Sequence, residues 1–165
     1  MLDIGAGSGH VARRLTRCLK AAGVDAAVVA TDLQWRHLAA GRRMLGGDSP
    51  PAVSADAFLL PFADRSVDWV VSNLFFHHFS PEENVRLLRS FARVARRGFL
   101  SLDLRRHRLP LLFVSLAGRY LFRSDASAKD GVASVRQAYT PPEAAAIAHE
   151  AVAGAAVERV FPFRL

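Results

Sequence analysis

The 165-residue sequence is poor in cysteine and in long apolar runs, and both shortages exclude classes of protein. Its single cysteine, Cys18, excludes a disulfide framework and a zinc site built from several cysteines. The longest apolar run, near 109–118, is too short to span a bilayer, and Met1 leads directly into a predicted strand rather than a signal peptide. We therefore expect a cytoplasmic protein with a single domain over residues 1–165.

Lysine is also scarce, although the chain carries a formal net charge of +7. Its 22 cationic residues include only Lys20 and Lys129 as lysines, and the rest are arginines. A nucleic-acid-binding protein is expected to gather its cations with aromatic residues on one face. Here the cations are dispersed, except around 93–97 and 105–108, so nucleic acid is not an expected partner.

The beginning of the chain carries the strongest motif, an apolar stub followed by D-x-G-x-G-x-G from Asp3 to Gly9. Glycines at this spacing allow a tight turn between a strand and a helix, and the helix start offers free N–H groups to a ligand. A dinucleotide fingerprint needs its third glycine where His10 stands, and no Gly-Lys-Ser/Thr follows to make a P-loop. The remaining interpretations are a cradle for another ligand, or a tight turn in an unrelated α/β domain.

Two further acids are predicted to follow strands. A second buried strand over 24–31 ends at Asp32, ahead of a helix over 33–45, and a short third strand over 52–55 precedes Asp56. A carboxylate after the second strand of a doubly wound sheet can accept hydrogen bonds from both hydroxyls of a ribose. Asp32 is equally suited to cap the following helix, and the two roles are compatible.

The run from Asp56 to Asn73, with Leu60-Pro61-Phe62 and Asp68 between them, makes the family resemblance specific. Together with the glycine motif, residues 1–104 resemble the class I S-adenosylmethionine-dependent methyltransferases, in particular the ubiquinone/menaquinone-biosynthesis-type enzymes. The resemblance implies S-adenosyl-L-methionine as cofactor, with Asp56 accepting from the adenine amino group and the Ala57 amide meeting a ring nitrogen. The implied cofactor-binding residues are Asp3, Gly5, Ala6, Gly7, Gly9, Asp32, Leu33, Asp56, Ala57 and Asn73.

The expected fold is a Rossmann-like, doubly wound, mostly parallel α/β sheet with helices on both faces and strand order 3-2-1-4-5-6. Strands four, five and six are predicted over 69–74, 99–104 and 155–163. In the family, helices precede the first strand and a seventh, antiparallel strand completes the sheet; neither is visible here. We therefore expect a fragment that is inactive alone and that self-associates through an exposed strand edge.

His77 and His78 follow the predicted fourth strand, where the family places the loop that faces the reacting methyl group. A histidine titrates near neutrality and is suited to act as a general base toward a hydroxyl acceptor. We rank His78 above His77. The alternative for either is a structural ring that helps to cap the helix beginning at Pro81, and an acidic carbon acceptor needs no base. Adjacent histidines without a carboxylate at ligand spacing do not predict a metal site. His10 is either a cofactor contact or an exposed first-turn residue.

Residues 105–135 are the candidate substrate lid. A basic entry precedes an apolar helix over 109–122, followed by a polar loop over 124–134. This helix is expected to cover an apolar or aromatic small-molecule acceptor, to contact an anionic membrane peripherally through 105–122, or simply to pack on the sheet. The predicted function is methyl transfer to oxygen or carbon of such an acceptor. The alternatives are S-adenosylmethionine binding without catalysis and a nicotinamide-dependent enzyme; the oligomeric state cannot be read.

Overall fold

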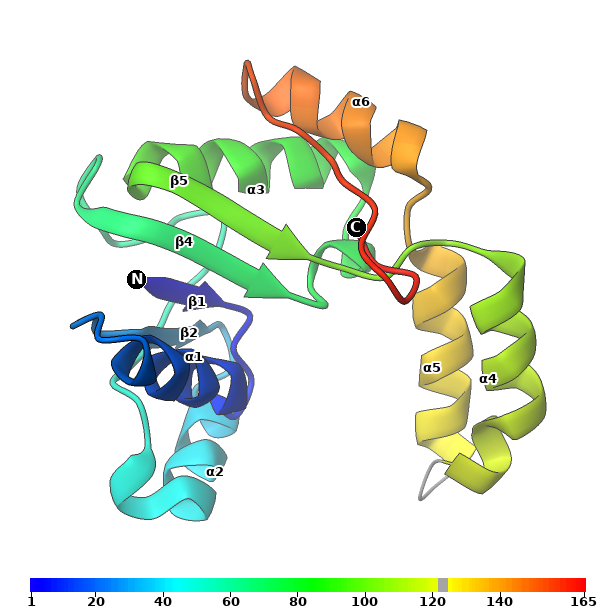
Figure 1. The fold of residues 1–165 in the computed structure, drawn as a ribbon, viewed down its shortest axis with the longest axis horizontal. Helices are drawn as coiled ribbons and strands as arrows, with labels where there is room; N and C mark the ends of the chain where they lie inside the picture. The colour runs from blue at the N-terminus through cyan, green and yellow to red at the C-terminus, as the bar shows by residue number, and fades with distance from the viewer. Residues whose placement is uncertain (122–124) are drawn as a thin grey trace. The chain divides into compact units, whose positions relative to one another are not determined.

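The computed structural model describes residues 1–121 and 125–165, which form two compact units (Figure 1). Unit 1 comprises Met1–Asn73 and Arg86–Ser101, and unit 2 comprises Leu74–Val85 and Leu102–Leu165.

Unit 1 is built on a five-stranded sheet of order β3-β2-β1-β4-β5, which confirms the order expected for the first five strands. The strands are β1 Leu2–Ile4, β2 Val29–Asp32, β3 Ala52–Ser54, β4 Val67–Asn73 and β5 Ala95–Leu102. β1 pairs in parallel with both β2 and β4, β2 pairs in parallel with β3, and β5 runs in the direction of β4 (Figure 1). Successive strands are added toward one edge of the sheet from β1 to β3 and toward the other edge from β4 to β5. The order therefore switches between β1 and β4, which is where ligands bind in doubly wound folds.

Three helices accompany this sheet, and their apolar residues recur at helical spacing. They are α1 His10–Ala21, α2 Trp35–Leu45 and α3 Pro81–Val94, with a short 3-10 turn η1 at Gly46–Asp48. The core of the unit consists of apolar side chains that are almost fully buried: Leu2, Ile4, Ala12, Val28, Ala30, Val70, Leu87, Leu88, Phe91 and Val94.

The second strand is shorter than the predicted 24–31, because its N-terminal half has no neighbour with which to pair. β1 begins at Leu2, and the ladder with β2 starts at the pair Leu2 and Val29. Ahead of that point only the Met1 ammonium reaches across, donating to the carbonyl of Ala27 at 2.7 Å. Val24 consequently lies 47% exposed in a loop.

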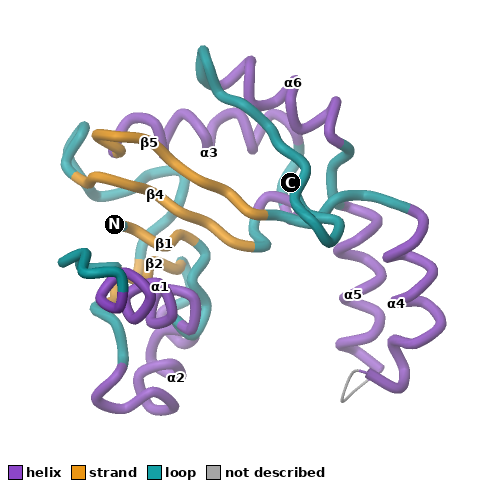
Figure 2. Tube along the Cα trace, in the orientation of Figure 1, coloured by secondary structure: helices purple, strands orange, loops and turns teal. Residues whose placement is uncertain are grey.

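Unit 2 contains the 3-10 turn η2 at Phe76–His78 and the helices α4 Arg108–Leu121, α5 Asp125–Gln137 and α6 Pro141–Ala151. α4 and α5 contact each other as a helical hairpin (Figure 2). The predicted polar loop over 124–134 is wrong from Asp125 onward, and Ser124 lies outside the described residues. α5 contacts α4, and Val135 in its last turn is buried, so tertiary packing overrides the polar, serine-containing composition. Within the described residues, no helix has both the length and the apolar character needed to cross a membrane.

The predicted sixth strand over 155–163 does not form; Figure 2 shows this segment as loop and turn. The C-terminal tail instead lies against the segment that follows β5: Asp103 and Leu165 exchange two backbone hydrogen bonds, and Arg105 N–H donates to the carbonyl of Phe163. Pro162 lacks a donor for a ladder, and Phe161 is 92% exposed, so this stretch has neither the hydrogen bonds nor the burial of a central strand.

Candidate functional site

The glycine loop leads from the end of β1 to α1 with left-handed backbone at its glycines. Gly5 and Gly7 have φ of 67° and 54°, and Gly9, at 75°, is the N-cap of α1 without a side-chain cap. A Cβ added at Gly7 would meet no atom within 4 Å, so the backbone there borders open space. A ligand can therefore approach the main chain closely at this position.

Asp32 ties this loop to the end of β2. One carboxylate oxygen accepts the N–H of Gly7 at 2.8 Å, and the other accepts the N–H of Gln34, just before α2, at 2.8 Å. Ala6 N–H also donates to the carbonyl of Thr31. Each carboxylate oxygen has two lone pairs, so the side chain keeps acceptor capacity for a ligand while it positions the loop and the start of α2.

Asp3 lies in β1, directly before the loop, and is 1% exposed. Burial raises the pKa of its carboxyl to about 6, although the N–H of Ala12 opposes the rise. Its Oδ2 has no hydrogen-bond partner in the described part of the chain. A buried acidic oxygen without a donor is costly, so this atom suits a cationic or donor group brought by a ligand.

Asp56 and Ala57 follow β3, the neighbour of β2. The amide of Ala55 donates to the carbonyl of Asp32, which joins the two strand ends, and Asp56 Oδ1 accepts the N–H of Phe58 at 2.9 Å. Ala57 is buried at 9% exposure, while Leu33 beside Asp32 is 64% exposed. The parallel strands β1, β2 and β3 are adjacent, so Asp3, Asp32 and Asp56 come from the same region of the sheet.

Gly41, in α2, supports the glycine loop from outside and was not predicted from the sequence. A Cβ added there would lie 2.1 Å from the carbonyl oxygen of Ser8 and 2.7 Å from its carbonyl carbon. Only glycine lets α2 approach the loop this closely. A glycine inside a helical pattern was the available signal.

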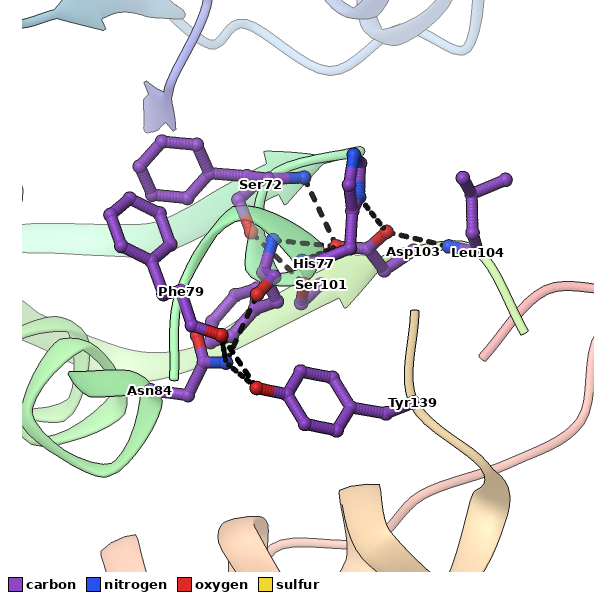
Figure 3. Close-up of polar contacts among 10 residues, drawn as sticks. Ser72, His77, Phe79, Asn84, Ser101, Asp103, Leu104 and Tyr139 are labelled. Atoms are coloured by element: carbon purple, nitrogen blue, oxygen red, sulfur yellow. Dashed lines mark hydrogen bonds and ion pairs between the residues drawn. The ribbon is translucent and has the colours of Figure 1, made fainter. Parts of the chain in front are cut away.

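In unit 2, Asp103 organises the turn that carries the two histidines (Figure 3). Its Oδ2 accepts the N–H groups of Phe75, Phe76 and His77, and its Oδ1 lies 2.7 Å from His77 Nδ1. Burial opposes ionisation of Asp103, but the His77 ring and the backbone donors outweigh it and hold the pKa of the carboxyl below its usual range. The carboxylate therefore fixes His77 with a proton on Nδ1. Asp103 escaped prediction because it follows β5, 26 residues after His77.

The two histidines have different surroundings. His77 is 5% exposed, whereas His78 is exposed, and their ring centroids lie 4.1 Å apart. Partial burial, with the neighbouring His77, lowers the pKa of His78, although Asp103 opposes the shift. His78 is therefore the neutral, accessible imidazole, and His77 is the ring held within the turn.

Asn84 and Tyr139 close the other side of this turn (Figure 3). The buried Asn84 donates from Nδ2 to the carbonyl of Phe76 at 3.0 Å, and the Tyr139 hydroxyl donates to the carbonyl of Phe79 at 2.6 Å. Asn84 Nδ2 also reaches the Tyr139 hydroxyl at 3.1 Å. The turn is thus anchored by residues from α3 and from the segment before α6.

The remaining predicted residues have less specific surroundings. Asn73 is the last residue of β4 and is partly buried, and the neighbouring Ser72 hydroxyl donates to Ser101 at 3.0 Å. His10 is the exposed first residue of α1. The surroundings of Asn73 and His10 do not indicate a specific function for either residue.

Comparisons with known proteins agree with this architecture. The sequence model of a family described as "Methyltransferase domain" matches residues 1–98. Among curated proteins, none matches the chain.

Solved structures similar to the chain include a SAM-dependent methyltransferase from Aquifex aeolicus, with 21% identity and a TM-score of 0.62 over 96% of this chain. The plantazolicin methyltransferase BamL, solved with SAH and a triazolic desmethylPZN analog, has 16% identity and a TM-score of 0.68 over 92%. LepI in complex with SAM has 15% identity and a TM-score of 0.68 over 99%. At these identities the likeness establishes the fold. The chain spans 72%, 53% and 40% of these three proteins.

Proposed function

Because the chain belongs to the methyltransferase domain family, we propose that it transfers the methyl group of S-adenosyl-L-methionine to an oxygen or carbon of a small, apolar or aromatic acceptor. The single observation that carries the cofactor assignment is the glycine loop: its backbone borders open space at Gly7, and the Asp32 carboxylate holds it in place. The unpartnered Oδ2 of the buried Asp3 adds a position suited to a cationic ligand group.

The residues at the strand ends of unit 1 fit the parts of this cofactor. Asp32 retains lone pairs for the ribose hydroxyls, and Asp56, which follows the neighbouring strand β3, retains a carboxylate oxygen for the adenine amino group. The exposed Leu33 offers an apolar surface to the adenine ring. The cofactor, when bound, supplies an electrophilic methyl group on a sulfonium. The chain's contribution is then to position the two reactants, which can supply roughly 7–11 kcal/mol of the barrier reduction.

For a hydroxyl acceptor we assign the general base to His78. Its lowered pKa leaves the ring neutral at pH 7, and its exposure leaves it accessible to a substrate. With the cofactor bound, the His78 ring would accept the proton that the acceptor hydroxyl loses as it takes the methyl group, and S-adenosylhomocysteine would be released as the S–CH3 bond breaks. His77, fixed by Asp103, is the second candidate and otherwise a positioning residue for the turn. An acidic carbon acceptor would require neither ring.

An aromatic acceptor is supported by the phenylalanines of the same turn. The rings of Phe75 and Phe79 lie 4.9 Å apart at 65°, an edge-to-face pair that could extend to a third ring. Peripheral membrane contact through residues 105–122 stays a prediction. Leu109, Leu112 and Phe113 are more than half exposed on one side of α4, and cosedimentation with phosphatidylglycerol vesicles measures such contact.

Cofactor binding without catalysis is the second candidate function. It is favoured by the extent of the family match, which ends at residue 98, ahead of Asp103 and all of α4 to α6. This candidate predicts unchanged binding of S-adenosylhomocysteine and no transfer of labelled methyl to any acceptor.

Calorimetric titration with S-adenosylhomocysteine and with NAD tests the cofactor assignment. We expect the first to bind and the second not to bind. Asp32→Ala should weaken S-adenosylhomocysteine by about 2–3 kcal/mol, because it removes charged acceptors from the ribose and the anchor of Gly7. The matched control is Asp25→Ala, an exposed loop acid, which should leave the affinity unchanged. Equal affinities for both variants would remove Asp32 from the site.

Transfer is tested with labelled S-adenosylmethionine and a panel of quinols, phenols and long-chain alcohols. His78→Gln should lower the rate with hydroxyl acceptors by about 10²–10⁴-fold while S-adenosylhomocysteine affinity stays the same. A wild-type rate in this variant would exclude His78 as the base.

A further inference from the structure

Unit 2 contains a pocket of about 410 Å³ that none of the preceding roles uses. It lies where the first turn of α4, the last turn of α5 and the start of α6 meet, at one end of the α4–α5 hairpin (Figure 1). We call it the α4–α6 pocket. Its volume is in the range of sites for organic ligands, and far larger than a single inorganic ion requires.

The apolar part of the wall is formed by Leu111 and Val135, which come from the two helices of the hairpin. Val135 is 5% exposed and belongs to the core of the unit, so its side chain has a fixed position. These residues can contact the hydrocarbon part of a ligand, but they do not discriminate between charged and neutral ligands.

Three arginines, Arg106, Arg108 and Arg136, line the same pocket. Arg106 is paired with Glu143 in α6, so one positive charge is already compensated. Arg108 and Arg136 are exposed, and within the described residues neither has an ion-pair partner. The pocket therefore joins an apolar wall to two uncompensated guanidinium groups.

The helix ends at the pocket are already satisfied by the chain itself. Thr140 and Glu143 form a capping box at the start of α6, and Leu109 N–H donates to His107 Nδ1 at 3.1 Å at the start of α4. Because Nδ1 of His107 accepts this bond, the neutral ring carries its proton on Nε2 and can donate from there. The charge available to a ligand thus comes from the arginine side chains and not from free helix N-termini.

We propose that the α4–α6 pocket binds an amphiphilic organic anion, whose apolar body packs on Leu111 and Val135 and whose head pairs with Arg108 and Arg136. The planar guanidinium matches a carboxylate or a phosphate monoester with paired hydrogen bonds. The site belongs to unit 2 alone, so binding there requires neither the cofactor nor methyl transfer.

Calorimetry at constant ionic strength with octanoate, octyl phosphate, octanol and acetate tests the proposal. We expect at least one eight-carbon anion to bind about tenfold or more tightly than octanol, because charged hydrogen bonds form only with the anion. Acetate should bind weakly, since it lacks the apolar body. The ratio of octanoate to octyl phosphate affinity identifies the preferred head.

The matched variants are Arg108→Gln/Arg136→Gln and, as a control of equal charge, Arg14→Gln/Arg43→Gln on exposed positions of unit 1. The first pair should lose about tenfold or more in affinity for the anion and keep its affinity for octanol; the second pair should lose neither. Backbone amide shifts on anion addition should occur at Leu111, Val135 and Thr140.

Equal binding of octanol and both anions would overturn the proposal, as would equal losses in the two variant pairs or amide shifts confined to other residues. Thermal melts establish that both double variants fold. S-adenosylhomocysteine binding, measured on the same samples, separates this proposal from the cofactor assignment, because either can fail while the other holds.

Discussion

At the scale of single residues, the most unusual group is the carboxyl of Asp3, which is buried and has one unpartnered oxygen. Its pKa is raised to about 6, so the ligand-free folded state holds a proton that the unfolded state releases near pH 4. Folding stability contributed by this group therefore falls as pH rises from about 4 to 6, and the full cost remains above pH 6.

We expect Asp3→Asn to remove this dependence. Measured by urea unfolding without ligand, the free energy of unfolding of the variant relative to wild type should rise by about 2.4 kcal/mol between pH 4 and pH 7, at roughly 1.4 kcal/mol per pKa unit. The variant should bind S-adenosylhomocysteine less tightly, because it loses the negative charge offered to a cationic group. Parallel stability curves for the two proteins across this pH range would contradict the assigned pKa.

Asp103 shows the opposite behaviour, since its pKa is held below the usual range by His77 and backbone donors despite burial. Its contribution to stability is present above the unfolded pKa near 4 and is lost as pH falls through the lower folded value. Asp103→Asn should destabilise the protein at pH 7 by about 1.5–3 kcal/mol, because one charged acceptor serves several donors.

The difference in unfolding free energy between wild type and Asp103→Asn should become smaller below pH 4, where the Asp103 carboxylate becomes protonated in wild type. Asp25→Asn, at an exposed acid in a loop, is the control and should change stability little. Nitrogen shifts of the His77 ring provide a separate readout: the Asp103→Asn variant should lose the fixed Nδ1–H tautomer. An unchanged tautomer would show that Asp103 does not orient the ring.

At the scale of elements, two effects act in opposite directions at Gly41, where α2 contacts the glycine loop. Helix propensity favours alanine at this position, and steric crowding excludes it. Alanine is favoured over glycine inside a helix by about 1 kcal/mol, but here its Cβ would lie 2.1 Å from the Ser8 carbonyl oxygen. A backbone clash of that size must displace α2 or the loop, so the steric effect dominates.

Gly41→Ala should therefore lower stability and weaken S-adenosylhomocysteine by about tenfold or more, as measured by calorimetry. Gly47→Ala is the matched control, because its Cβ would meet no atom within 4 Å. If Gly41→Ala binds the ligand as tightly as this control, the glycine loop does not depend on its support from α2.

The elements that could be predicted from the sequence are those whose pattern is local. The glycine loop and the helix start that follows it could be predicted from spacing and turn chemistry. The order of the first five strands was expected from the family resemblance rather than from a local pattern. The extent of β2 could not be predicted, because it depends on where β1 begins. The helix α5 was missed because its burial comes from α4, and the tail because it pairs with residues 103–105. Gly41 and Asp103 act through residues distant in sequence, which no local pattern reveals.

At the scale of the whole molecule, we expect the exposed edges of the sheet to determine whether the chain self-associates in solution. β3 and β5 are the edge strands of the described sheet. β5 carries Arg96 and Arg97, both ion-paired with Asp68, toward its beginning, but Leu100 farther along is 63% exposed. Charged residues discourage edge-to-edge pairing, and an exposed apolar residue favours it. The second half of β5 is therefore the expected contact for self-association.

Leu100→Lys should reduce this association, because a charge on the edge must be desolvated when another strand adds. Light scattering over a range of protein concentrations should show a growing mean mass for wild type and a nearly constant one for the variant. Leu59→Lys is the control: Leu59 is 78% exposed but lies in a loop, so the same added charge leaves the edge unaltered. If both variants suppress association equally, net charge is the cause rather than the edge. A wild-type chain that stays monodisperse at all concentrations would show that β5 needs no protection.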